Sequence, residues 1–269
     1  MSSRRLVLGL VLPLALSAAA CSAAPAALPA MKLVDLTHDF AQDTIYWPTE
    51  SGFELTQVSH GLTDKGYWYE ANRFAAAEHG GTHVDAPAHF AEHGDTVDRI
   101  PLGRLVGPAV VVDVSDAAAG DRDHLVSVGE LEAFEARHGR IPDGAIVLLR
   151  TGYGAWWPDR VRYLGTDLRG AAGVAALHFP GLSPEAARWL MDQRRLRAVG
   201  IDTASIDRGV SQTFDTHVAL FARGVPAFEN VANLEQLPAT DVTVIALPMK
   251  IRGGSGGPLR IIAMVPEGR

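Results

Sequence analysis

The sequence predicts an α/β protein with a mixed β-sheet that forms a barrel-like or layered core. Short, nearly continuous apolar runs are typical of strands that are buried on both faces. Amphipathic segments with helical spacing lie between these runs, and the expected strands outnumber the expected helices. With 269 residues, of which 47% are hydrophobic, the chain can form one large domain around a sizeable core.

The expected strands are apolar runs rich in β-branched and aliphatic residues. They are residues 32–36, 109–114, 145–149, 198–201, 242–247 and 259–265. Residues 43–50 are expected to form a loop, and residues 67–77 are expected to be extended or mixed.

Two segments have the pattern of helices. Residues 128–138 are amphipathic. A second helix is expected to begin after Ser183, a good N-cap residue, with Pro184 at its first position. Glu185 follows, where an acidic side chain meets the positive end of the helix dipole. This helix should run to about Arg195.

The first thirty residues have the composition of an export signal. Two arginines precede an apolar run at residues 6–16, and small residues lead to Cys21. The run is too short to span a bilayer, which needs about 20 residues. We expect residues 1–20 to be a lipoprotein-type signal peptide, Cys21 to carry a lipid anchor and residues 21–30 to be an Ala/Pro-rich tether.

Such a signal implies an exported protein, retained as a cell-envelope lipoprotein. A conventional cleavable signal, which would release a secreted protein, is the alternative, and both Sec and twin-arginine export fit the sequence.

Charge and cysteine content bear on the expected partners. The formal net charge is −7 and no run of Lys or Arg stands out, so nucleic acid is not an expected partner. Cys21 is the only cysteine, so no intrachain disulfide can form. Contact with a membrane is expected only through a lipid on Cys21.

Residues 79–89 concentrate the groups that can carry chemistry: three histidines and an aspartate. A Gly-Gly pair and a proline oppose a helix here, so a tight turn followed by a short strand is the better interpretation. His83 and Asp85 would then point to one side of the strand and Val84 to the core. The glycines would let His79 join them. Two imidazoles and a carboxylate suit Zn, Mn or Fe(II).

The residues alone leave other interpretations open. The histidines could form hydrogen bonds within a loop, although gathering these polar groups without a metal carries a cost. Two histidines and a carboxylate also hold iron in non-haem Fe(II) enzymes. A third alternative is a non-catalytic binding lipoprotein with a vestigial metal site.

The same segment resembles the His-x-Gly-Thr-His-x-Asp-x-Pro-x-His signature of the cyclase family of metal-dependent hydrolases, which includes bacterial kynurenine formamidases and isatin hydrolases. All fixed positions of this signature are matched, by His79, Gly81, Thr82, His83, Asp85, Pro87 and His89. The resemblance extends over most of residues 32–265, and residues 200–207 are similar to the family's Asp-Thr-x-Ser-x-Asp stretch. It implies that residues 31–269 form one hydrolase domain, a swivelling β/β/α fold with flanking helices.

The resemblance also implies roles for particular residues. Five of them would be metal ligands: His79, His83, Asp85, His217 and Glu229. Asp85 and Glu229 could bridge two ions, and the metal would be zinc, with manganese as the alternative, in one or two sites. His89 would be the proton shuttle. From the residues alone, its place four positions after Asp85 lets it approach a metal-bound water without being a ligand.

By the same resemblance, the reaction is hydrolysis of a C–N bond other than a peptide bond in a small amide. An aryl formamide such as N-formylkynurenine is the first candidate, and a cyclic amide or lactone is the second. Export argues against a role in cytoplasmic tryptophan breakdown. Trp47 is the expected ring-stacking contact, and Thr82 is a candidate donor to the developing oxyanion. A homodimer or higher homo-oligomer is expected.

Overall fold

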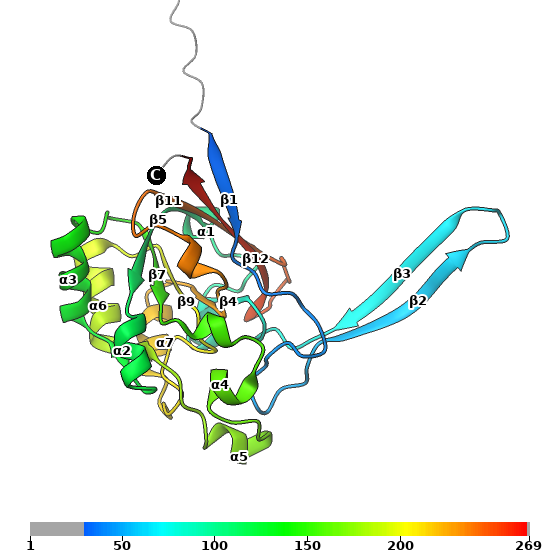
Figure 1. The fold of residues 1–269 in the computed structure, drawn as a ribbon, viewed down its shortest axis with the longest axis horizontal. Coiled ribbons are helices and arrows are strands. Elements are labelled where there is room, and N and C mark those ends of the chain that lie inside the picture. Colours follow the sequence, from blue (N-terminus) through cyan, green and yellow to red (C-terminus); the bar gives the residue numbers. More distant parts are fainter. Residues whose placement is uncertain (1–29, 268–269) are drawn as a thin grey trace, which may run out of the picture.

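A computed structural model describes residues 30–267 of the chain (Figure 1). The expected signal peptide at residues 1–20, the anchor at Cys21 and all but the last residue of the tether lie outside the described residues, so they stay predictions. Within the described range, no helix combines the length and hydropathy needed to cross a membrane.

The core is one mixed eight-stranded sheet. Its strands are β1 (Met31–Asp35), β4 (His83–Asp85), β5 (Val106–Asp113), β7 (Ile146–Arg150), β9 (Ala198–Ile201), β10 (Ala227–Glu229), β11 (Val242–Pro248) and β12 (Gly256–Pro266). They lie in the order β1-β12-β11-β5-β7-β9-β10-β4, and β4 also pairs with β12. Seven strands therefore close into a barrel, and β1 extends one edge of β12. This confirms the predicted fold class.

Strands β5, β7, β9 and β10 run parallel, whereas the pairings of β4, β11 and β12 are antiparallel. The parallel strands are buried on both faces, as their continuous apolar sequences predict. Alternate side chains of β7 show this: Val147 packs toward the outer helices, and Leu148 packs inside the barrel.

Helices cover the outer face of the parallel strands (Figure 1). They include α2 (Ser115–Gly120), α3 (Val128–His138), α6 (Pro184–Arg194) and α7 (Asp215–Phe221). Helix α3 begins with a full capping box between Ser127 and Glu130. Helix α6 begins as predicted, because the Ser183 hydroxyl accepts a hydrogen bond from the Ala186 N–H at 3.1 Å.

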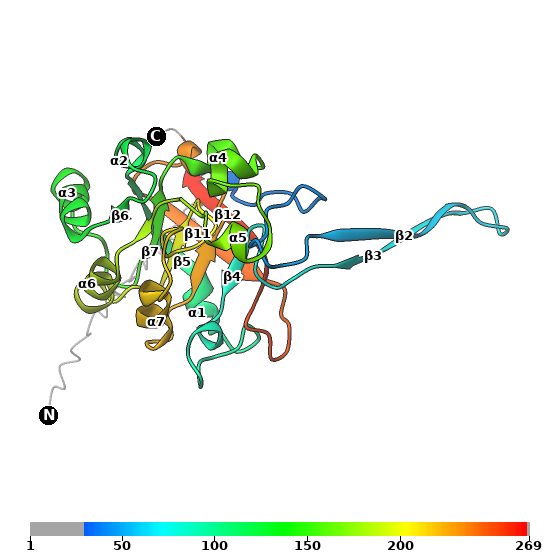
Figure 2. The same ribbon diagram turned by 90° about the horizontal axis from the view of Figure 1, so that it is seen from below.

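The remaining elements are short, with one exception. The short ones are α1 (Leu102–Leu105), α4 (Arg160–Leu164), α5 (Gly170–Val174), β6 (Leu125–Val126), β8 (Gly181–Leu182) and 3₁₀ turns at Pro87–His89, Tyr153–Trp156 and Leu234–Gln236. The exception is a long hairpin of β2 (Glu54–Leu62) and β3 (Trp68–Ala75), which projects from the barrel (Figures 1 and 2). Sequence analysis expected extended structure at 67–77 but missed β2.

Glycine allows the barrel to close. Gly256 of β12 lies opposite Asp85 of β4. A Cβ atom at position 256 would lie 2.5 Å from His79 Cε1 and 2.6 Å from the Val84 carbonyl oxygen. Only a residue without a side chain lets the two strands approach this closely.

A bidentate ion pair joins the two long outer helices. Arg194 of α6 donates two hydrogen bonds of 2.6 Å to Glu135 of α3, which also accepts one from the Ile141 N–H. Both charged side chains are largely shielded from water. Hydrogen bonds from Arg194 lower the pKa of Glu135, against the opposing effect of burial.

Because the Glu135 pKa is lowered by folding, its contribution to stability is present above the unfolded pKa of about 4.5 and is lost as the pH falls through the folded value. Glu135→Gln should therefore lower the free energy of unfolding by roughly 1–2 kcal/mol at pH 7. The difference from the wild type should shrink below pH 4.5. Urea denaturation across this pH range measures it. Glu92→Gln, on exposed Glu92 outside the helices, is the control and should change little. A pH-independent loss for Glu135→Gln would contradict the prediction.

Candidate metal centre

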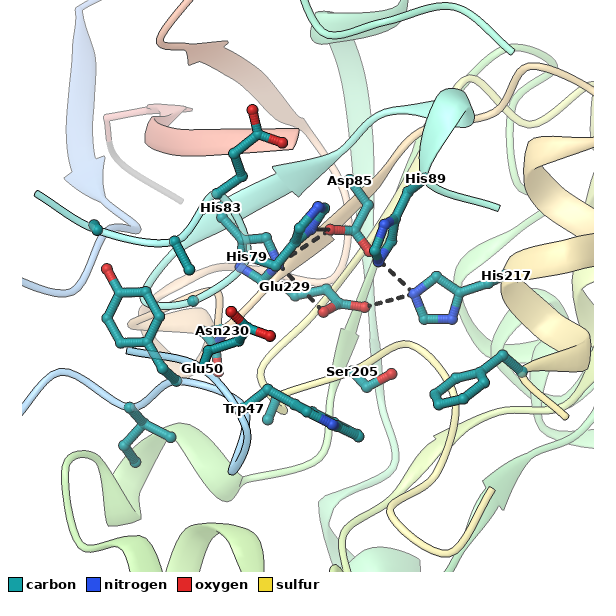
Figure 3. A pocket seen from close by; sticks show the side chains of 18 of the residues that line it. Trp47, Glu50, His79, His83, Asp85, His89, Ser205, His217, Glu229 and Asn230 are labelled. Carbon is teal, nitrogen blue, oxygen red and sulfur yellow. Dashed lines mark hydrogen bonds and ion pairs between the residues drawn. The ribbon is translucent and has the colours of Figure 1, made fainter. Parts of the chain in front are cut away.

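The predicted metal ligands and His89 line one cavity of about 550 Å³ on the outer side of the barrel (Figure 3). Short strands, a turn and one helix bring them together from distant parts of the sequence. The contributing residues are His79 before β4, His83 and Asp85 on β4, His89 after it, His217 on α7 and Glu229 on β10.

Strand β4 has the predicted orientation. Val84 is fully buried inside the barrel, so His83 and Asp85 on either side of it face outward into the cavity. Antiparallel pairing with β10 places Glu229 directly opposite His83. Cross-strand neighbours on one face lie close together, which explains how a glutamate 146 positions later joins the site.

A glycine turn brings His79 back to β4. Gly81 has φ +56, and a Cβ atom there would lie 2.6 Å from Phe40 Cε1. His79 Nδ1 lies 2.7 Å from Asp85 Oδ1, and its Nε2 lies 2.9 Å from the hydroxyl of Ser255. The chain therefore folds back at the glycines as predicted, and His79 joins Asp85.

Asp85 is the centre of the cluster. Its carboxylate oxygens lie 2.7 Å from His79 Nδ1, 3.1 Å from His83 Nε2 and 3.0 Å from His217 Nε2. Burial opposes the charge, but the nearby His79 and hydrogen bonds from His217 and His79 hold the pKa of Asp85 well below its usual value. The group is therefore an anion that needs a cationic partner.

Glu229 adds a second buried carboxylate. Its oxygens lie 3.2 Å from His217 Nε2 and 3.5 Å from His83 Nε2, and it accepts a 2.7 Å hydrogen bond from the Ile206 N–H. Burial and the charge of Asp85 raise the pKa of Glu229. Two carboxylates in one buried cluster form a strong site for positive charge.

The hydrogen bonding of His83 indicates whether the cluster can hold a metal ion. Its Nδ1 lies 2.9 Å from the Gly81 carbonyl oxygen, which can only accept, so Nδ1 carries a proton. Its buried Nε2 has no hydrogen-bond partner among the described residues, although two carboxylates are close. In neutral His83 this Nε2 presents a lone pair toward those oxygens, an arrangement that a divalent cation between them would satisfy.

The donor atoms form two overlapping groups that share Asp85. One contains His79, Asp85 and His89, and the other contains His83, Asp85 and Glu229; within each group the donor atoms lie within 4.8 Å of one another. The residues therefore fit one or two divalent ions. His89 lies close enough to His79 and Asp85 to be a metal ligand, or to act, as predicted, as a proton shuttle beside the metal.

Asp207 orients His217, a role that sequence analysis missed. Its carboxylate lies 2.6 Å from His217 Nδ1 and also accepts hydrogen bonds from the backbone N–H groups of Thr216 and His217. His217 Nε2 is thereby directed to Asp85 and Glu229. In the sequence, the only indication of this role was the position of Asp207 at the end of the 200–207 stretch. That stretch contains three other polar residues, so the pattern alone does not single out Asp207.

His89 is held as a neutral base. Its ring stacks on His79 with a centroid distance of 3.8 Å. Burial lowers the pKa of His89 to about 4, although the charge of Asp85 raises it in part. The imidazole is therefore unprotonated at neutral pH and can accept a proton.

The two predicted substrate contacts are placed differently. Trp47 lines the cavity and packs against Phe179 and Phe214. Thr82 is fully buried and does not line the cavity. Its hydroxyl donates to the Asn230 carbonyl oxygen at 2.6 Å and accepts from the His38 N–H at 2.9 Å, which ties neighbouring loops together.

The barrel, the buried His/Asp/Glu cluster and the adjoining cavity define this chain as a metal-dependent hydrolase. A profile of the family described as "Putative cyclase" matches residues 34–208, and the chain belongs to this cyclase family. It is 31% identical to an isatin hydrolase of Roseibium aggregatum over 89% of both chains. It is 30% identical to a kynurenine formamidase of Salinibacter ruber over 86% of this chain and 97% of that one.

Solved structures have the same fold. Isatin hydrolase A from Labrenzia aggregata, bound to benzyl benzoate, aligns with a TM-score of 0.79 and 35% identity over 88% of this chain and 94% of that one. A protein described as a "potential metal-dependent hydrolase with cyclase activity" aligns with a TM-score of 0.66 and 25% identity, over 88% of this chain and 100% of that one.

Asp207→Asn should weaken metal binding by about 10–100-fold, because the amide cannot hold the His217 ring as the carboxylate does. Metal titration of the chelator-treated protein, followed by mass spectrometry of bound metal, measures the change. Asp121→Asn, on the exposed Asp121, is the matched control and should bind metal as the wild type does. Unchanged affinity in Asp207→Asn would remove Asp207 from the metal centre.

Proposed function

We propose that the protein hydrolyses an amide bond next to an aromatic ring in a small, uncharged compound, with a cyclic amide of the isatin type as the first candidate. The observation that carries this proposal is the composition of the cavity. Metal donors lie on one side, Trp47, Phe90 and Phe214 supply aromatic surface, and the charged side chains outside the donor cluster are acidic.

The charge of the cavity distinguishes between substrate classes. Of the described residues that line it, none is Lys or Arg, whereas Glu50 and Glu78 are present. A substrate with a carboxylate would lack a cationic partner here. N-formylkynurenine has such a carboxylate and isatin does not. Sequence analysis placed the aryl formamide first, and the cavity favours the reverse order.

An aryl formamide remains the second candidate because of Glu50. Its carboxylate at the cavity could pair with the ammonium group of an amino acid such as N-formylkynurenine. The 30% identity to a kynurenine formamidase also supports this alternative.

We propose zinc as the metal, with manganese as the alternative, held by His79, His83, Asp85, His217 and Glu229 in one or two sites. When bound, a divalent ion lowers the pKa of water from 15.7 toward about 7 and polarises a carbonyl group. The buried carboxylates and imidazoles hold this charge in place.

The chain's own residues then move protons and orient the substrate. Neutral His89 accepts a proton from the water whose oxygen adds to the amide carbon. The C–N bond breaks, and protonated His89 returns the proton to the leaving nitrogen, so one water yields a carboxylic acid and an amine. Trp47 and Phe214 lie where they can pack against the substrate's ring.

Replacement of His89 should impair catalysis without loss of the metal. His89→Ala should lower kcat by about 10²–10⁴-fold, because the variant lacks the imidazole that accepts the proton of the water. Metal analysis should show wild-type content in this variant, whereas His83→Ala should lose metal. Loss of metal from His89→Ala would instead make His89 a ligand.

The substrate proposal predicts a ranking. Steady-state kinetics should give a higher kcat/KM for isatin than for N-formylkynurenine. Glu50→Gln should leave the isatin reaction nearly unchanged and raise KM only for a substrate with an ammonium group, because that charge alone uses Glu50. A higher kcat/KM for N-formylkynurenine, lost in Glu50→Gln, would overturn the order in favour of the formamide.

A further inference from the structure

The ring of His79 is more open to the cavity than its neighbours in the donor cluster. Its side chain is 22% exposed, against 2% for His83 and 3% for His217. Close packing alone therefore does not hold the ring of His79, and its orientation depends on hydrogen bonds. Two residues without an assigned role, Glu78 and Ser255, lie where they can supply them.

Ser255 connects Glu78 to the ring of His79. The Ser255 hydroxyl donates a hydrogen bond of 2.8 Å to Glu78 Oε2, and the Ser255 N–H donates one of 2.9 Å to the same oxygen. The hydroxyl oxygen also lies 2.9 Å from His79 Nε2, the ring nitrogen that does not face Asp85. A line of hydrogen bonds therefore runs from the Glu78 carboxylate through Ser255 to His79.

The backbone on both sides of Ser255 leaves room for this arrangement only because it consists of glycine. A Cβ atom at Gly254 would lie 2.6 Å from Glu78 Oε1, and one at Gly256 would lie 2.5 Å from His79 Cε1. Neither glycine has a positive φ, so close approach rather than backbone conformation explains both. Gly256 is also paired with β4, which fixes the position of Ser255.

The direction of the hydrogen bonds determines which nitrogen of His79 carries the proton. A carboxylate only accepts, so the single hydroxyl proton of Ser255 points to Glu78. The hydroxyl oxygen can then only accept from the ring, so Nε2 of His79 carries a proton. In a neutral imidazole the other nitrogen, Nδ1, presents a lone pair. Nδ1 lies 2.7 Å from Asp85 Oδ1, so a cation shared by these two atoms would satisfy both (Figure 3).

His83 is held in the opposite way. Its Nδ1 carries the proton, because it faces the Gly81 carbonyl oxygen, and its Nε2 faces Asp85 and Glu229. The two histidines therefore present different nitrogens to the cluster, Nδ1 from His79 and Nε2 from His83. Each needs its own hydrogen-bond acceptor on the other side of the ring, and Ser255 is the acceptor for His79.

We propose that Glu78 and Ser255 are positioning residues that hold His79 with its Nδ1 lone pair toward the metal. A carboxylate that binds the remote nitrogen of a ligating histidine fixes the ring and raises its basicity. Here the carboxylate acts through a serine hydroxyl. The proposal rests on the proposed metal centre but not on the choice of substrate.

The same relay supports the proposed base. The ring of His89 stacks on that of His79 with a centroid distance of 3.8 Å and an interplanar angle of 17°. A His79 ring that turned about its side-chain bonds would remove this flat contact. Glu78 and Ser255 therefore also hold the surface against which His89 lies.

Zinc titration of the chelator-treated full chain tests the relay. Ser255→Ala and Glu78→Gln should each weaken zinc binding by about 10–100-fold. In Glu78→Gln the amide can donate to the Ser255 hydroxyl, whose proton then turns to His79 and favours the wrong tautomer. Ser51→Ala and Glu92→Gln, at exposed positions, are the matched controls and should bind zinc as the wild type does.

The double variant separates the relay from a simple effect of charge. Because Glu78 reaches His79 only through Ser255, Glu78→Gln should cost little further affinity once Ser255 is replaced by alanine. An equal loss in both backgrounds would show that the Glu78 charge acts through space, and would overturn the relay. Wild-type affinity in both single variants would also overturn it. A wild type that binds no zinc would instead overturn the metal centre on which the proposal rests.

A second measurement needs no variant. In zinc-loaded protein with isotope-labelled histidine, nitrogen NMR should find the ring proton of His79 on Nε2 and that of His83 on Nδ1, after assignment of both rings through the backbone. The proposal would fail if the ring proton of His79 were on Nδ1.

Discussion

Two buried carboxylates, those of Asp85 and Glu229, are the constraint around which the rest of the structure is arranged. Each lies on the outer face of a barrel strand, and their charges need compensation because water is largely excluded. Three imidazoles surround Asp85. Burial alone would lower the pKa of His217, but the hydrogen bonds of its ring to Asp207, Asp85 and Glu229 raise the pKa well above its usual value. The cluster attracts positive charge, which is the property that catalysis by a cation requires.

The strand that carries Asp85 also completes the fold. Strand β4 has only three residues, yet it pairs with β10 on one side and β12 on the other. The first pairing brings Glu229 to His83, and the second brings Gly256 against His79. Assembly of the site and closure of the barrel therefore depend on the same few hydrogen-bonded residues.

Local patterns were enough to predict β4, the orientation of His83 and Asp85, the strands β5, β7 and β9, and helix 128–138, whereas the three-residue strand β10 was not predicted. Glu229 and His217 were identified only by resemblance, because contacts between distant segments bring β10 and α7 to β4. Strand β2 was missed because its side chains are exposed on both faces, which removes the alternation that marks a half-buried strand. The second contact of Thr82, with His38, likewise depends on tertiary structure.

The close approach of β12 to β4 at Gly256 closes the barrel and also holds the metal donors together. The stability of the fold and the integrity of the metal site are therefore coupled. The donors of the cluster come from β4, β10 and α7, and they disperse when the barrel opens. Any ion that occupies the cluster adds its binding free energy to the native state alone, so heat resistance should rise with the supply of that ion. Because Cys21 is the only cysteine, no intrachain disulfide adds to this stability, so the supply of the metal would decide how long each molecule survives.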